Sequence, residues 1–296
     1  MMRHISYMDR QDYPALYIDA DAASDAAQLK LLNLQKWTAF TLVIGAFLAL
    51  YDGENRVVLG LAAVVFLSSL VCVLLGHFQK LQSKWYKSRA LAESIKTASW
   101  RFMMGAKPFN GKSQSEISLF ADLLSELLKE NKDIGLDLSA GASDQDQITS
   151  YMTEARLTSY QKRKDIYLQS RIDQQRSWYK DKAAKSVDAS QRWILIVSLL
   201  YLGAICCLIA RITCPSLKWL PTEALAVAAS CALGWMQIKR FDEQAAAYSL
   251  TSHEIGIIKV QFQSVNSAEE LGKFVEDAEN AFSREHTQWA ARRDYL

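Results

Sequence analysis

Long uncharged runs constrain this chain more than any other feature of its sequence. Residues 37–51 contain no charged side chain, and after a short polar turn residues 57–76 are uncharged again. A helix needs about 20 residues to cross a hydrocarbon core of roughly 30 Å. The second run has this length, whereas the first reaches only about 22 Å and must thin the bilayer or extend with interfacial residues. The pattern predicts a transmembrane helical hairpin.

A second pair of uncharged runs follows at residues 193–210 and 224–238. Pro215 and Pro221 lie between them and prevent one continuous helix. Shifting the chain by about 161 residues superposes the two hairpins and the helices that follow them, although the copies share few identical side chains. Buried helices of a soluble bundle are the alternative, because two of the four runs are shorter than an ordinary membrane span.

The composition favours helices throughout. Half of the residues are hydrophobic and 22% are charged, which fits a chain that is part membrane hairpin and part polar helix. Prolines and glycines are few, and no alternation of β-branched residues predicts strands. We therefore expect an all-α membrane protein with two tandem transmembrane hairpins and a cytosolic helical layer. The expected divisions are an N-terminal cytosolic segment, a first hairpin with cytosolic helices, a linker, and a second hairpin with long cytosolic helices, at residues 1–36, 37–130, 131–145 and 146–296.

Lysines and arginines flank the outer ends of both hairpins and are fewer in the turns inside them. Segments rich in Lys and Arg stay in the cytoplasm, so both hairpins are expected to enter from the cytoplasm and return to it. Both termini would then be cytoplasmic. No cleavable signal peptide is expected, because the first apolar run begins only at Trp37, behind a polar segment. The flanking cations are Lys30, Lys36, Lys80, Lys84, Lys87 and Arg89 for the first hairpin, and Lys180, Lys182, Lys185, Arg192, Lys239 and Arg240 for the second.

One segment imitates a phosphate-binding loop. Residues 106–113, AKPFNGKS, fit a relaxed form of that motif, but the loop requires a strand before it and a free amide at each position. The preceding segment is predicted to be a helix that ends near Gly105, and Pro108 removes one amide. The histidines and cysteines show no metal-ligand spacing, and no catalytic arrangement of side chains is present. We expect neither an enzyme nor a cofactor or metal site.

Two stripes of small and polar residues lie within the predicted membrane helices. Small residues allow close approach of helix backbones, so tight helix packing is the simpler interpretation of both stripes. The alternative is that the first stripe lines a water-filled pore in an oligomer, with Asp52 at its outer mouth. The first stripe is Thr38, Thr41, Gly45 and Asp52, and the second is Ala226, Ser230 and Gly234.

A basic stretch precedes the second hairpin. One long helix is expected to run from Asp146 into the membrane, and between Arg156 and Arg192 it carries ten basic residues against four acidic ones. A solvated helix face beside anionic lipid headgroups explains such a run. A docking surface for a phosphorylated small molecule or a nucleic acid is the alternative, although a net charge of +2 gives no support for sequence-specific nucleic-acid binding. The candidate docking residues are Lys162, Arg163, Lys164 and Arg171.

Residues 89–102, RALAESIKTASWRF, followed by Pro108 and Phe109, resemble the SLATT family. The hairpin, the helix with this core, the Trp and the Pro-Phe pair occur in the family order from Gln35 to about Leu128. The second half resembles another member of the group, with the motif reduced to SLTSHEI at residues 249–255.

The resemblance implies a bacterial two-helix membrane effector in nucleotide-signalling defence systems. Such effectors are thought to form pores or perturb the membrane when a partner senses infection or damage. We therefore expect an oligomeric, pore-forming or membrane-disrupting protein of the bacterial inner membrane. Its expected partners are membrane lipid, further copies of the chain, and a cytosolic sensor protein or nucleotide signal. The alternative is a non-conducting membrane scaffold that recruits cytosolic partners.

Overall fold

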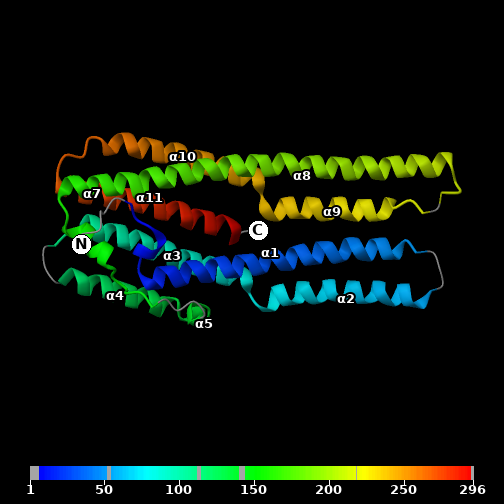
Figure 1. The fold of residues 1–296 in the computed structure, drawn as a ribbon, viewed down its shortest axis with the longest axis horizontal. Helices are drawn as coiled ribbons and strands as arrows, with labels where there is room; N and C mark the ends of the chain where they lie inside the picture. The colour runs from blue at the N-terminus through cyan, green and yellow to red at the C-terminus, as the bar shows by residue number, and fades with distance from the viewer. Residues whose placement is uncertain (1–6, 52–54, 112–114, 140–143, 218, 295–296) are drawn as a thin grey trace. The chain divides into compact units, whose positions relative to one another are not determined.

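The computed structural model describes residues 7–51, 55–111, 115–139, 144–217 and 219–294, and every regular element in these ranges is helical (Figure 1). The all-α prediction is confirmed. The longer helices are α1 (Ala15–Ala49), α2 (Arg56–Phe78), α3 (Leu81–Met104), α4 (Ser115–Glu130), α8 (Gln174–Thr213), α9 (Thr222–Lys239), α10 (Phe241–Phe262) and α11 (Ala268–Asp294). The shorter ones are η1 (Arg10–Asp12), η2 (Lys132–Ile134), α5 (Gly135–Ser139), α6 (Ser150–Leu157), α7 (Tyr160–Tyr167) and the π-helical η3 (Leu168–Asp173).

The described chain forms two compact units, each built from several stretches of sequence. The membrane unit comprises Leu29–Lys80 and Tyr179–Thr251, and it contains all four uncharged runs. The polar unit comprises Met1–Gln28, Leu81–Trp178 and Ser252–Leu296. The chain passes from one unit to the other within α1, between α2 and α3, within α8 and within α10. The C-terminal α11 packs along α3, the helix that follows the first hairpin. The domain boundaries expected from the sequence stay a prediction.

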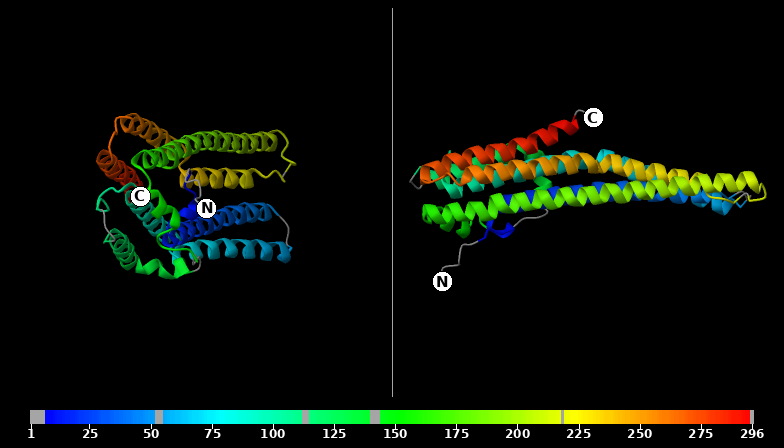
Figure 2. Two further views of the ribbon diagram at one scale, coloured as in Figure 1. Left: turned by 60° about the vertical axis from the view of Figure 1, so that its left-hand side comes forward. Right: turned by 90° about the horizontal axis from the view of Figure 1, so that it is seen from above.

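The four helices of the membrane unit lie antiparallel in the order α2, α1, α9, α8 (Figure 1). In the first hairpin, Gly45 of α1 lies against the ring of Phe66, and this contact packs α1 on α2. In the second hairpin, Trp193 of α8 packs beside Trp235 of α9, with the ring centroids 6.3 Å apart. The two hairpins meet where Cys231 of α9 approaches the Ala39 carbonyl of α1. The C-terminal ends of α1 and α8 lie at the same end of this unit (Figure 2).

Three helical stretches of the described chain are long and apolar enough to cross a membrane: Ala15–Ala49, Arg56–Met104 and Tyr160–Thr213. Only 6% of the apolar window in the second of these is buried inside the chain. A soluble bundle would bury such a surface, so this exposure supports a lipid environment. The fourth uncharged run lies on the alanine-rich α9, which is not one of the three. The membrane class is confirmed, and a crossing by α9 stays a prediction.

Helix α3 lies at the centre of the polar unit and contacts α4, α6, α7 and α11. Its buried side chains include Ile95, Trp100 and Phe102, which are at most 1% exposed. The helix ends at Gly105, whose φ of +68° suits a residue without Cβ, and the amide of Ala106 donates to the Arg101 carbonyl at 2.9 Å. The predicted stop at Gly105 is therefore confirmed.

The prediction of a single long helix from Asp146 onward is wrong, because the helical conformation is interrupted between α6 and α7. Thr158 follows α6 in an extended conformation, with ψ at 166°. The side chain of Ser159 then caps α7 by accepting from the amide of Lys162. A hydroxyl that satisfies an open amide makes a new helix start favourable, and this interrupts the apolar periodicity without any Gly or Pro.

Candidate functional site

The predicted pore stripe on α1 occupies two environments. Thr38 and Thr41 are half-buried, and their hydroxyls donate to carbonyls of their own helix, Leu34 and Trp37, at 2.9 Å each. Gly45 is instead buried, and a Cβ added there would lie 2.8 Å from Cζ of Phe66. Gly45 therefore serves close packing of α1 on α2. Asp52 lies outside the described residues.

The second stripe, on α9, is not the face that packs within this chain. Ala226 and Ser230 are exposed, and a Cβ added to Gly234 would meet no described atom within 4 Å. The helix buries Ala224, Ala229 and Ala232 instead. The choice between these faces cannot be read from the sequence, because alanines occur all around α9.

The basic stretch is engaged within the polar unit rather than free in solvent. Lys162, Arg163 and Lys164 are half-buried. The Nη1 of Arg163 donates to the Met104 carbonyl at 3.0 Å. The ammonium of Lys164 donates to the Val265 carbonyl and lies over the ring of Phe262. These contacts bind α7 to its neighbours, so Arg163 and Lys164 have structural partners.

Arg171 was expected on the docking surface, but it is buried. Its side chain is 2% exposed and forms a bidentate ion pair with the fully buried Glu279 of α11, through Nε at 2.8 Å and Nη2 at 2.7 Å. Burial by itself would lower the pKa of Arg171, but the adjacent carboxylate outweighs it and holds that pKa above its usual range. Its position on η3 turns it into the core, beside the buried Tyr167 and Ile172.

Two further side chains complete this polar cluster, which we call the α11 clasp. The hydroxyl of Tyr167 donates to Oε1 of Glu279 at 3.0 Å, and that of Thr97 on α3 donates to Oε2 at 3.2 Å. The clasp thus joins α3, α11 and the η3 segment that leads directly into α8. Sequence reasoning missed it. The available signal was a carboxylate on the apolar face of α11, next to Ala278 and four residues after Val275.

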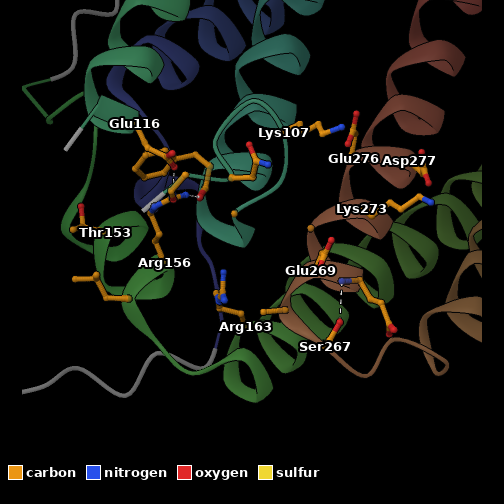
Figure 3. A pocket seen from close by; sticks show the side chains of 18 of the residues that line it. Lys107, Glu116, Thr153, Arg156, Arg163, Ser267, Glu269, Lys273, Glu276 and Asp277 are labelled. Atoms are coloured by element: carbon orange, nitrogen blue, oxygen red, sulfur yellow. Dashed lines mark hydrogen bonds and ion pairs between the residues drawn. The ribbon is translucent and has the colours of Figure 1, made fainter. Parts of the chain in front are cut away.

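An open cleft of about 1440 Å³ lies elsewhere in the polar unit, between the loop after α3, α6, α7 and the first turns of α11. Arg156 and Arg163 face it from one side, and Glu269 projects from α11 (Figure 3). Arg156 pairs with Glu116 and donates to the Phe109 carbonyl, so it holds the loop that resembles a phosphate-binding motif. Lys112 and Ser113 of that loop lie outside the described residues.

The cleft carries both signs of charge. Arg163 makes no ion pair among the described residues, its buried Nε has no hydrogen-bond partner, and burial together with the neighbouring Arg156 lowers its pKa. Lys107 points toward Glu276 of α11, while Lys273 points away from the arginines (Figure 3). Such a surface suits a ligand or protein segment that itself carries both charges, rather than a simple anion.

Comparison with family models accounts for almost the whole chain. A model described as SMODS and SLOG-associating 2TM effector domain 3 matches residues 14–164, and one described as SMODS and SLOG-associating 2TM effector domain 1 matches residues 167–289. The chain belongs to the SLATT family. The predicted tandem arrangement is confirmed, and the two matches meet at the C-terminal end of α7. The chain shows no significant match to a curated protein or to a solved structure.

Membership in the SLATT family establishes a membrane effector with two such domains in tandem. Each domain contributes one hairpin to the membrane unit, α1–α2 from the first and α8–α9 from the second. The α11 clasp joins them within the polar unit, because Thr97 belongs to the first domain and Glu279 and Arg171 to the second. The two SLATT domains follow one another in sequence, but they pack against each other within the polar unit.

Proposed function

We propose that this SLATT protein is an oligomeric effector that forms a pore or disrupts the bilayer in a bacterial defence or stress-signalling system. It would lie in the inner membrane with both termini in the cytoplasm. Four membrane helices without a buried charge are not a self-sufficient transporter, so a conducting path would require several subunits.

The open face of α9 is the observation that carries this proposal. Ala226 and Ser230 are small, exposed in the single chain, and located on an alanine-rich helix. Lipid gives such a face little stabilisation, whereas a second helix can approach small residues closely and accept polar contacts. Packing against another subunit would cover this face and leave the hydroxyl-bearing stripe of α1 for a polar path.

An activating signal would bind to the polar unit. The open cleft exposes Arg163 and Glu269 to a cytosolic sensor protein or a nucleotide-linked signal, the two activators that the family resemblance implies. Binding there would act on α7 and on α11, the two elements that also carry the clasp or lead into it. A signal needs different affinity for two arrangements of these helices in order to activate the protein.

Liposome flux tests the proposal. The purified full chain, reconstituted in vesicles, should release an entrapped dye or ions when its activating partner is added, and Thr41→Leu should abolish the release while the oligomer persists. Ser198→Leu on α8 is the matched control, because it also removes a hydroxyl of the membrane unit that donates to a carbonyl of its own helix. Vesicles that stay sealed under every activating condition would reject the proposal.

The scaffold alternative makes the opposite prediction. Thr41→Leu would leave a scaffold working, whereas charge reversal at Lys162, Arg163 and Lys164 would impair the recruitment of partners. Unfolding temperatures must accompany this second experiment, because Arg163 and Lys164 also hold α7 in place. Lys162→Glu alone is the cleaner variant, since within the described part of the chain the Lys162 ammonium forms no hydrogen bond or ion pair.

A further inference from the structure

The two SLATT domains repeat one order of helices in the polar unit. RALAESI at residues 89–95 of α3 corresponds to SLTSHEI at residues 249–255 of α10, a shift of 160 residues. The Ser-x-x-Glu pattern at residues 113–116, at the start of α4, recurs at residues 267–270, at the start of α11, a shift of 154 residues. Helices α3 and α4 of the first domain are therefore the counterparts of α10 and α11 of the second.

Helix α11 of the second domain packs along α3 of the first. The hydroxyl of Thr97 donates to Glu279 at 3.2 Å, and a Cβ added to Gly272 would lie 3.0 Å from the Gly105 carbonyl oxygen. The residue numbers rise along one helix as they fall along the other, so the two helices are antiparallel. The buried face of α11 consists of Leu271, Gly272, Val275, Glu279 and Phe282.

The counterpart helices, α4 and α10, do not pack along each other in the described chain. Ile257 of α10 corresponds to Thr97 at the shift of 160 residues, and it is 60% exposed. Val260, one turn further on, is 66% exposed. Both helices therefore present an open face where their counterparts make a contact. The positions of α4 that correspond to the buried face of α11 are all exposed: Ile117, Ser118, Ala121, Ser125 and Leu128.

We infer that α4 of one chain packs along α10 of a second copy, as α11 packs along α3 within one chain. The antiparallel register of the intrachain contact, transferred to this pair, places Ser125 beside Ile257 of the second copy and, one helical turn on, Lys129 beside Glu254. Lys129 and Glu254 are both exposed, and neither forms an ion pair among the described residues. Opposite charges at matching positions favour a second copy as the occupant.

This contact rests on the proposed oligomer and adds to it an interface in the polar unit, separate from the open face of α9. Each copy offers one α4 and one α10, so the same contact can repeat around a closed ring of two or more chains. Every α4 and every α10 in such a ring is covered, which removes the exposed apolar residues of both helices from water.

Disulfide cross-linking of the full chain in detergent tests the contact. The five native cysteines are first replaced by alanine. One chain then carries Ser125→Cys, another carries Ile257→Cys, and the two are mixed under an oxidant. The mixture should yield a dimer that contains both chains, and neither chain alone should yield a dimer. Leu119→Cys in place of Ser125→Cys is the matched control, because Leu119 is also exposed but lies two residues after Ile117, on the opposite side of α4.

An exchange of charges tests the register without cysteines. Lys129→Glu and Glu254→Lys should each weaken self-association about threefold, because each places like charges where an exposed ion pair would form. The chain that carries both substitutions should regain the original association, measured by sedimentation in detergent. Both side chains are exposed, so the unfolding temperature of the single chain should not change.

Three results would overturn the inference. They are a mixture of Ser125→Cys and Ile257→Cys chains without a mixed dimer, an equal yield from the Leu119→Cys control, and a doubly substituted chain that does not regain association. A chain that oligomerises without the cross-link would leave these two faces to a partner of another kind. Liposome flux is measured separately, so flux that persists without the cross-link rejects this contact and leaves the proposed pore standing.

Discussion

Arg171 and Glu279 are held by more hydrogen bonds than a surface ion pair requires, and both are removed from solvent. A buried charge that loses its partner keeps the whole cost of its desolvation. Arg171→Met and Glu279→Gln should therefore each destabilise the protein by about 3 to 5 kcal/mol, because either change leaves the other buried charge unpaired. The amide of Glu279→Gln has one accepting oxygen, so it can accept from Tyr167 or from Thr97 but not from both. Thermal unfolding of the full chain in detergent measures both.

The paired replacement is the control for this prediction. Arg171→Met combined with Glu279→Leu removes both charges, so its unfolding temperature should lie above that of Arg171→Met alone. A double variant as unstable as the sum of both single variants would show that the two charges do not act as a pair.

Two buried tyrosines in the same unit make stability sensitive to alkali. Burial raises the pKa of Tyr13 and of Tyr167 well above the ordinary value. The folded protein then retains protons that the unfolded chain releases near pH 10, so stability should fall as the pH rises above about 10. The unfolding temperature between pH 8.5 and 11 should therefore fall less steeply for Tyr13→Phe than for the unchanged chain. Tyr7→Phe, at an exposed ring, is the comparison that should leave the slope unaltered.

Residue burial shows where sequence reasoning stopped. Lys162, Arg163, Lys164 and Arg171 look alike as one basic run, but of the four only Arg171 is buried. The distinction depends on the partner, and Glu279 lies 108 residues away. Periodicity ranks positions along one helix, but it cannot pair two helices that are so distant in the chain.

At the scale of elements, the first hairpin depends on a close approach of α1 to α2. Gly45→Leu would drive a side chain into Phe66, and overpacking of this kind typically costs about 1 to 3 kcal/mol. The hairpin should splay, and the unfolding temperature should fall even in a variant that is never activated. Phe66→Ala in the same chain should recover part of the loss, because it makes room for the leucine.

This prediction separates packing from conduction. If Gly45→Leu lowers flux without lowering the unfolding temperature, Gly45 lines a path and does not pack against Phe66. Thr41→Leu should lower flux without lowering the unfolding temperature, because the Thr41 side chain is half-buried and its hydroxyl donates only to carbonyls of α1.

The elements themselves were largely predictable. The absence of charge located the apolar halves of α1, α2, α8 and α9, and Gly105 with Pro108 located the end of α3. The break after Leu157 was not predictable from breaker residues, because it rests on the side chain of Ser159. The packed face of α9 was not predictable either. Its buried alanines differ little in chemistry from the exposed residues of the other face; they are Ala224, Ala229 and Ala232, against Ala226 and Ser230.

At the scale of the whole molecule, two SLATT domains share one polar unit, and α11 is the element that joins them. It packs along α3, which follows the first hairpin, and its Glu279 holds η3, which precedes the second. A signal that displaces α11 would therefore release both domains together. Two packed arrangements that differ by a few kcal/mol suffice for a switch of this kind.

Weakening the clasp should imitate the signal. Glu279→Gln removes the counter-charge of Arg171 and so destabilises the arrangement that contains the clasp, and the arrangement without the ion pair gains population. Expressed in bacteria without an activating partner, this variant should slow growth and depolarise the membrane, and Thr41→Leu added to it should abolish both effects. Lys162→Gln is the control, because it removes a charge from the neighbouring α7 without touching Glu279. If Glu279→Gln is folded, inserted and harmless while an activated chain remains toxic, the clasp is a structural ion pair and the signal acts through another contact.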